Sequence, residues 1–209
     1  MITNRLSALM GERHIKATRI ASDTGIARST LTALTSGSSK MIQFETINTL
    51  CQYLRVEPKD FFEYVPIDIS FDVETTSISA FFNMDPDTLN WSQGIEKYTA
   101  DVFAKFLSRN NIIKTIELSA TLEDPSIVHG GENYILSGAE SVTINVDDTK
   151  DEQLDTFWHE HKLESFINVL ETDLENAVQE EVVSAANKDT QSGVFDSWNV
   201  SAAIPVMPF

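Results

Sequence analysis

Residues Ala21–Gly37 read ASDTGIARSTLTALTSG and contain seven serine and threonine residues, two glycines and one arginine. We interpret this run as two short helices that meet steeply at a turn. Two helix backbones that approach closely need a small residue at the contact, which Ala21 supplies. The turn needs a residue that tolerates a positive φ, which Gly25 supplies. The aliphatic residues expected to hold the second helix on a core are Ile26, Leu31 and Leu34.

The second of these helices is predicted to present a polar outer face. Its outward positions are short or able to hydrogen-bond, as a surface that enters the major groove of DNA must be. These positions are Arg28, Ser29, Thr32, Ala33 and Ser36.

The first 66 residues contain signals for about five short helices and none for a strand. The apolar spacing predicts helices that start near Leu6 and Lys16, a third over Ala27–Thr35 that ends before Gly37, and a fourth with a C-terminal turn starting at Pro58. The fourth helix is expected to bury one apolar face, made of Phe44, Ile47, Leu50, Cys51 and Leu54.

Residues 17–36 match the twenty-residue helix-turn-helix pattern at Ala21, Gly25, Ile26, Leu31 and Leu34. The chain continues with TINTLCQYLRVEPKDFFEY, and residues 2–64 as a whole resemble the lambda-repressor/Cro/Xre family of bacterial and phage regulators. The resemblance implies a lambda-repressor-like, all-α domain whose second motif helix, Ala27–Thr35, reads bases. It implies base contacts from Arg28, Ser29 and Thr32 and phosphate contacts from Lys16, Thr18, Ser39 and Lys40. Ala27 and Ser36 complete the expected DNA-binding set.

The chain departs from the family pattern at one point. Many members begin the first motif helix with Thr-Gln, whereas this sequence has Lys16-Ala17. One polar contact is therefore missing, and we expect Lys16 to replace it electrostatically. Other interpretations stay open for single residues: Ser29 or Thr30 caps the helix, and Lys40 is a solvated surface charge. A helical bundle that binds another protein is the alternative for the whole segment.

The charge of the chain is distributed unevenly. Residues 1–66 carry eight basic and six acidic side chains, a net charge of +2, whereas residues 67–209 carry seven basic and 26 acidic ones, a net charge of −19. This asymmetry indicates two modules: a DNA-binding domain over 1–66 and an acidic α+β domain over 67–209, used for oligomerisation or regulation. DNA phosphate repels the acidic module, so DNA contacts are expected from the first module only.

Strict alternation of apolar and polar residues predicts strands in the second module. They are expected at 67–73, 116–122, 133–137, 141–146 and 198–206, the last of them at a sheet edge because of Pro205. Residues 87–109 fit a helix and a strand equally well. Residues 151–187 form the clearest helix of the module, with a break near Glu164 or Asp173. We therefore expect a sheet with one or two long helices.

The composition also indicates the cellular compartment in which the protein is expected. No apolar run is long enough to span a membrane, no signal peptide is visible, and the single cysteine, Cys51, excludes an intrachain disulfide. We expect a cytoplasmic protein with no membrane partner and with Cys51 buried.

Motifs for catalysis are weak. His159 and His161 flank Glu160, but on a helix two such residues point about 200° apart, so a metal site is disfavoured. His129 is expected in a loop, and no self-cleaving serine motif is recognisable. We expect no enzyme activity, no metal and no cofactor.

The leading hypothesis is a sequence-specific transcriptional regulator, most simply a repressor, that binds an inverted-repeat operator in double-stranded DNA as a homodimer or higher homo-oligomer held by the second module. The alternative is an antitoxin-like interaction protein whose acidic C-terminal domain binds a basic protein partner. A metal enzyme that uses the two histidines ranks third.

Overall fold

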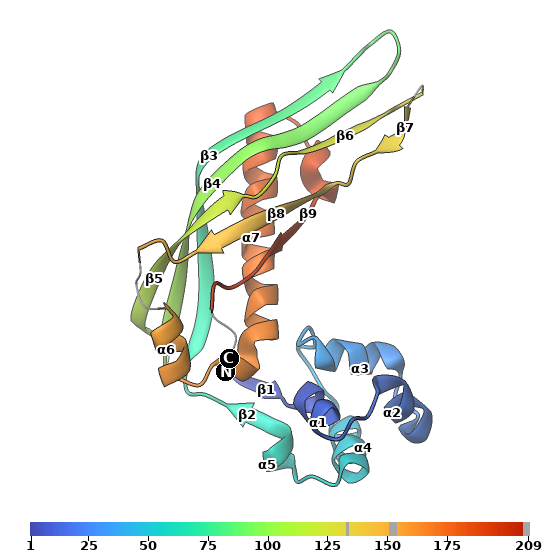
Figure 1. Ribbon diagram of the computed structural model, residues 1–209, viewed down its shortest axis with the longest axis vertical. Coiled ribbons are helices and arrows are strands. Elements are labelled where there is room, and N and C mark those ends of the chain that lie inside the picture. The colour runs from blue at the N-terminus through green and yellow to red at the C-terminus, as the bar shows by residue number, and fades with distance from the viewer. Residues whose placement is uncertain (133, 151–153, 207–209) are drawn as a thin grey trace. The chain divides into compact units, whose positions relative to one another are not determined.

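The computed structural model describes residues 1–132, 134–150 and 154–206. The chain divides into two compact units, one of Met1–Asp68 with Trp158–Thr172 and one of Ile69–Phe157 with Asp173–Phe209. Figure 1 shows a helical N-terminal region followed by strands and one long helix. The predicted fold class, a helical helix-turn-helix domain followed by an α+β domain, is confirmed.

The N-terminal region contains the five expected helices. Pro58 occupies the first turn of the last of them, where a missing backbone N–H costs nothing. The helices are α1 (Leu6–Glu12), α2 (Ala17–Thr24), α3 (Arg28–Thr35), α4 (Phe44–Leu54) and α5 (Pro58–Phe61).

The expectation that this segment has no strand is wrong at its two ends. The strands β1 (Ile2–Asn4) and β2 (Phe62–Tyr64) pair antiparallel. The N-terminal ammonium group extends this contact by donating to the carbonyl of Val65 at 2.7 Å and to that of Ile67 at 2.8 Å. Strands of three residues are too short to show an alternating pattern, and their pairing depends on residues about 60 positions apart.

One hydrophobic core holds the five helices together. Its most buried members are Leu6, Leu9, Ile20, Leu31, Leu34, Leu50, Cys51, Leu54 and Phe61. Cys51 is buried, as predicted, and burial raises the pKa of its thiol. Phe44 corrects the sequence analysis: it was expected on the inner face of α4, but it is 90% exposed. Phe44 is the first residue of α4, and its side chain points away from the core against which Ile42 and Ile47 pack.

The sheet contains seven described strands. The predicted strands near 67–73, 116–122, 133–137, 141–146 and 198–206 are all present. Residues 133 and 151–153, which fall in the predicted strand over 133–137 and in the predicted helix over 151–187, lie outside the described residues. The strands are β3 (Asp68–Met84), β4 (Trp91–Ser108), β5 (Asn111–Leu122), β6 (Ser126–Gly131), β7 (Tyr134–Ser137), β8 (Ser141–Asp147) and β9 (Asn199–Ala202).

The ambiguous segment 87–109 is the strand β4, which organises the sheet. It pairs antiparallel with β3, with β5 through residues 99–108 and with β6 through residues 91–95. The sheet runs β7-β6-β4-β5-β8-β9, and β9 lies at its edge as predicted. Strand β9 is parallel to β8, so the chain between them has to cross over from one end of the sheet to the other. This connection contains the helices within residues 154–190.

The long helix α7 (Ile167–Thr190) has a buried stripe at intervals of four residues, at Leu170, Leu174, Val178, Val182 and Ala186. Its side chains also bond to strand β3: the N–H of Thr75 donates to Glu181 at 3.3 Å, and the N–H of Ala80 donates to Asp189 at 2.9 Å. These bonds join the part of α7 that follows Asp173 to β3 within the second compact unit.

The predicted helix over 151–187 breaks close to Glu164. The helix α6 (Leu154–Glu160) is followed by a short 3₁₀ turn, η1 (Glu164–Phe166), and then by α7; a second such turn, η2 (Val194–Ser197), precedes β9. No helix in the described ranges is long and apolar enough to cross a membrane.

Candidate nucleic-acid interface

The turn between α2 and α3 is held by local hydrogen bonds. Gly25 has a φ of 76° and donates its N–H to the carbonyl of Ala21 at 3.0 Å. The Thr24 hydroxyl donates to the Ile20 carbonyl at 2.6 Å and accepts the N–H of Ile26 at 3.3 Å. A positive φ is accessible to glycine without a steric penalty, so the expectation for Gly25 is confirmed.

The core fixes the orientation of α3. Leu31 and Leu34 are fully or almost fully buried, at 0% and 4% exposure. Ile20 of α2 is buried in the same cluster. Ala21 of α2 and Ile26 in the turn are half-buried and pack against it. The three aliphatic residues therefore pack as predicted.

The opposite side of α3 is open. Arg28, Thr32 and Ser36 follow at steps of four residues, so they share one face, and Ser29 lies beside them; all four are exposed. Ala27 is exposed at the N-cap position, which lacks a side-chain capping bond. The alternative role of Ser29 or Thr30 as a helix cap is therefore wrong.

The loop after α3 uses its serine hydroxyls internally. Gly37 reverses the chain at a φ of 74°. Ser39 is half-buried; its N–H donates to the Ala33 carbonyl at 3.1 Å and its hydroxyl donates to the Met41 carbonyl at 2.7 Å. The Ser36 hydroxyl lies 3.0 Å from that of Ser38. Lys40, at the surface of this loop, is exposed.

The basic residues of this domain fall into two groups. Three of them form ion pairs with acidic side chains: Arg5 with Glu12 and Glu63, Arg19 with Asp23, and Lys59 with Glu57. Across the part of the chain that the structure describes, the side chains of the other five form no ion pair or hydrogen bond: Arg13, Lys16, Arg28, Lys40 and Arg55. Three members of the second group belong to the predicted DNA-binding set, and their charges are not neutralised by the protein.

The two residues expected at α2 lie at its N-terminus. Lys16 is the N-cap residue and Thr18 is in the first turn, and both side chains are exposed. A helix N-terminus has unpaired backbone N–H groups and a positive dipole end, which favour a phosphate there. The position thus suits the phosphate contacts expected of Lys16 and Thr18.

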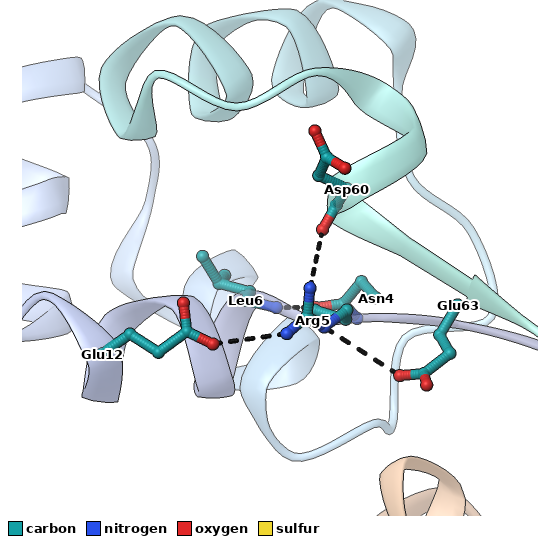
Figure 2. Close-up of polar contacts among 6 residues, drawn as sticks. All are labelled: Asn4, Arg5, Leu6, Glu12, Asp60 and Glu63. Atoms are coloured by element: carbon teal, nitrogen blue, oxygen red, sulfur yellow. Dashed lines mark hydrogen bonds and ion pairs between the residues drawn. The ribbon is translucent and has the colours of Figure 1, made fainter. Parts of the chain in front are cut away.

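Sequence reasoning missed Asn4, which joins three elements. Its amide nitrogen donates to the Leu34 carbonyl in the last turn of α3 at 3.0 Å, and its Oδ1 accepts the N–H of Leu6 at 3.1 Å. Figure 2 shows Asn4 next to Arg5, whose guanidinium reaches Glu12, Glu63 and the carbonyl of Asp60. An Asn just before an apolar helix is a capping signal, but its bond to α3 depends on tertiary structure.

His129 and His159 lie on different elements of the structure. His159 lies on α6 and its Nδ1 is 2.9 Å from Glu164 Oε1, while His161 follows the end of the helix. His129 lies in strand β6, so its placement in a loop was wrong. Within the described ranges, no group of three His, Cys, Asp or Glu side chains is placed to hold a metal ion.

Two short helices joined at a glycine turn, with the second held by aliphatic residues and open on its polar side, define a helix-turn-helix DNA-binding domain. The family comparison agrees: residues 5–66 match the model of the Cro/C1-type HTH DNA-binding domain, and this N-terminal third of the chain is a domain of that type.

The chain was also compared with solved structures and with curated proteins. A crystal structure described as a "putative DNA-binding protein from Bacteroides fragilis" matches 30% of this chain and 100% of its own, with 19% sequence identity and a TM-score of 0.28. No curated protein matches the sequence.

Proposed function

We propose that the protein is a sequence-specific transcriptional regulator that acts in the cytoplasm of a bacterium or in a phage-infected cell. The main observation behind the proposal is the exposed face of α3. Arg28, Ser29 and Thr32 are exposed on this helix, whereas Leu31 and Leu34 are buried in the core. Side chains near the N-terminus of a recognition helix are those that reach base edges.

We further propose that the protein acts as a repressor on an inverted repeat. One helix-turn-helix contacts only a few base pairs, and two copies on two half-sites reach useful specificity. The acidic module, with a net charge of −19, weakens nonspecific attraction to phosphate and thereby favours the specific site. The proposal assigns this module to oligomerisation or regulation, with residues 1–66 as the DNA-binding domain.

Selection of bound sites from random double-stranded DNA tests this proposal. The expected result is a set of sites with two inverted half-sites, bound in a gel shift with an affinity that falls steeply with salt. A folded protein that enriches no sequence and shifts no DNA at low salt contradicts it. A reporter gene placed behind the selected site then distinguishes repression from activation.

A second candidate function is suggested by the charge of residues 67–209. An acidic surface attracts a basic protein, as in an antitoxin-like pair. Such a partner is expected to co-purify at low salt and to be released at about 0.5 M salt, where screening is strong. Purification of the chain alone from its native source at low salt argues against this role.

A further inference from the structure

The helix-turn-helix domain contains a basic pocket apart from the exposed face of α3. Its volume is about 460 Å³, which lies within the range of small-molecule sites. Among the described residues, none that lines this pocket is acidic, although the chain as a whole has a net charge of −17. Its basic residues are Arg13, His14, Arg19 and Arg55. We call it the Arg13 pocket.

Three segments of the domain meet at the Arg13 pocket. Arg13 and His14 follow the end of α1, Arg19 is in the first turn of α2, and Arg55 follows the end of α4. The rest of the lining is an apolar wall of Ile15, Tyr53 and Leu54. The pocket therefore combines several guanidinium groups with an apolar side, as a site for an organic anion requires.

The arginines of the pocket differ in how far their charge is neutralised. Arg19 pairs with Asp23 at 3.4 Å, and Asp23 also accepts the hydroxyl of Tyr53 at 2.7 Å. Within the described ranges, the side chains of Arg13 and Arg55 form no ion pair or hydrogen bond. Two positive charges are thus uncompensated. A phosphate monoester carries about −1.5 to −2 at pH 7, and guanidinium groups bind phosphate through paired N–H donors.

The backbone at Arg55 is in a conformation that favours glycine. Its φ is 52°, in the left-handed region, where helices usually end with glycine. His14, after α1, has a φ of 55°. A cation is favourable near a helix C-terminus, yet in the described part of the chain the Arg55 side chain donates to no carbonyl group. Strained residues of this kind cluster at ligand sites.

We propose that the Arg13 pocket binds the phosphate group of a small organic phosphate monoester, whose remaining part lies on the apolar wall. Arg13 and Arg55 donate to the phosphate oxygens, and Arg19 adds a third positive charge. The proposal goes beyond the regulator function and does not depend on it, because the pocket can be tested without DNA.

The pocket and the expected DNA contacts lie on different sides of α2. Arg19 and Asp23 are four residues apart and share one side of this helix, whereas Thr18 points about 100° away from Arg19. The phosphate contact expected of Thr18 is therefore separate from the pocket. A ligand in the pocket touches the first motif helix without covering Thr18, as an effector of DNA binding would.

Nuclear magnetic resonance of the full-length, ¹⁵N-labelled protein tests the proposal. The probes are phenyl phosphate and the singly charged phenyl sulfate, which present the same ring. Phenyl phosphate is expected to shift the amide signals of His14, Arg19 and Arg55 in a saturable way, with a Kd of about 1 mM or lower. Phenyl sulfate is expected to bind about tenfold more weakly. The absence of saturable shifts with about 10 mM phenyl phosphate overturns the proposal.

Arginine variants identify the site. Arg13→Ala and Arg55→Ala are each expected to weaken phenyl phosphate binding about tenfold, the effect of losing one charged hydrogen bond. Arg109→Ala is the matched control, since Arg109 is also exposed and has a φ of 49°, but lies in the turn between β4 and β5. Unchanged binding in the first two variants overturns the proposal. An equal loss in Arg109→Ala also overturns it, because net charge would then account for binding.

Asp23→Asn gives a change of the opposite sign. It removes the charge that neutralises Arg19 and keeps an acceptor for Tyr53, so phenyl phosphate binding is expected to strengthen about two- to fivefold. Weaker binding by this variant contradicts the proposal.

Random double-stranded DNA is the last probe. If DNA shifts the amide signals of Tyr53 and Arg55 and phenyl phosphate does not, the pocket binds backbone phosphate and the proposal is overturned. Failure of the wild-type protein to enrich any DNA site contradicts the regulator function instead.

Discussion

The side-chain amide of Asn4 donates a hydrogen bond to the main-chain carbonyl of Leu34 at 3.0 Å, across 30 positions of sequence. Leu34 lies in the last turn of α3, where carbonyl groups have no partner within the helix. Asn4 also accepts the N–H of Leu6 at the start of α1. One side chain at the end of β1 thus fixes both the beginning of α1 and the end of the candidate recognition helix.

Asn4→Ala removes both hydrogen bonds at once. We expect the free energy of opening of α1 and α3 to fall by about 1–2 kcal/mol, the usual cost of losing a cap and a partly buried hydrogen bond. Native-state hydrogen exchange of the Leu9 and Leu31 amides measures this change. Asn4→Asp keeps the acceptor for Leu6 but places a carboxylate against the Leu34 carbonyl, so it should loosen α3 more than α1. Unchanged exchange in Asn4→Ala contradicts the structural role.

Gly25 and Gly11 form a matched pair. A Cβ atom added at either position has no heavy atom within 4 Å, so neither substitution causes a clash. Gly25 has a φ of 76°, whereas Gly11 is inside the helix α1. We expect Gly25→Ala to destabilise the domain by about 1 kcal/mol through backbone strain.

The partner substitution Gly11→Ala is expected to stabilise the domain by about 0.5–1 kcal/mol, because alanine loses less backbone entropy in a helix. Hydrogen exchange of core amides in the domain measures both changes. If both substitutions changed the stability of the domain in the same direction, the backbone angle φ would not be the property that distinguishes these glycines.

Arg28 and Lys16 are expected to differ in their effect on DNA binding. Arg28→Ala should cost about 1–3 kcal/mol on the selected site and little on random DNA, as loss of a base contact does. Lys16→Ala should weaken both kinds of binding and reduce the magnitude of the salt slope by about one. Titrations at several salt concentrations measure both quantities.

Lys59→Ala is the control for charge alone. It removes one positive charge from the same domain, but Lys59 already pairs with Glu57 at 2.9 Å. We expect little change in affinity or in salt slope. An effect as large as that of Arg28→Ala would mean that net charge, and not the α3 face, governs binding.

Tyr98 should make the second module sensitive to alkaline pH. Burial on β4 raises the pKa of its hydroxyl to about 12, above the ordinary value of 10.0. The folded state holds this proton more tightly than the unfolded state, so its contribution to stability is present below about pH 10. That contribution is lost as pH rises from about 10 to about 12.

Ultraviolet titration is expected to show a late tyrosine ionisation to which Tyr98 contributes. Tyr98→Phe should reduce that late step and flatten the fall in stability between about pH 10 and 12. Tyr64→Phe is the control, since Tyr64 is 70% exposed. A titration curve in which Tyr98→Phe loses an ordinary, early step contradicts the assignment.

The candidate site was largely predictable from residues close together in sequence. Gly25, Ile26 and Leu31 define a turn and an inward helix face within a few positions, and the structure confirms each of them. The predicted contacts with DNA remain predictions. Phe44 was not predictable in this way: its spacing fits the apolar face of α4, but its side chain is 90% exposed.

The segment 87–109 shows a different limit. Its apolar residues satisfy the periods of a helix and of a strand, and only pairing with β3, β5 and β6 settles the choice. Tertiary partners override a local pattern in such cases.

Features that depend on near neighbours could be predicted from the sequence: the glycine turn, the proline at the start of α5, the alternation of the strands and the split in charge. Features that join distant residues became visible in the folded chain, namely the β1–β2 pair, the Asn4 bond to Leu34 and the exposure of Phe44. The two groups differ in the sequence distance over which the interactions act. Backbone preferences and side-chain periodicity act over a few residues, whereas pairing, burial and surface shape depend on which distant segments the folded chain brings together.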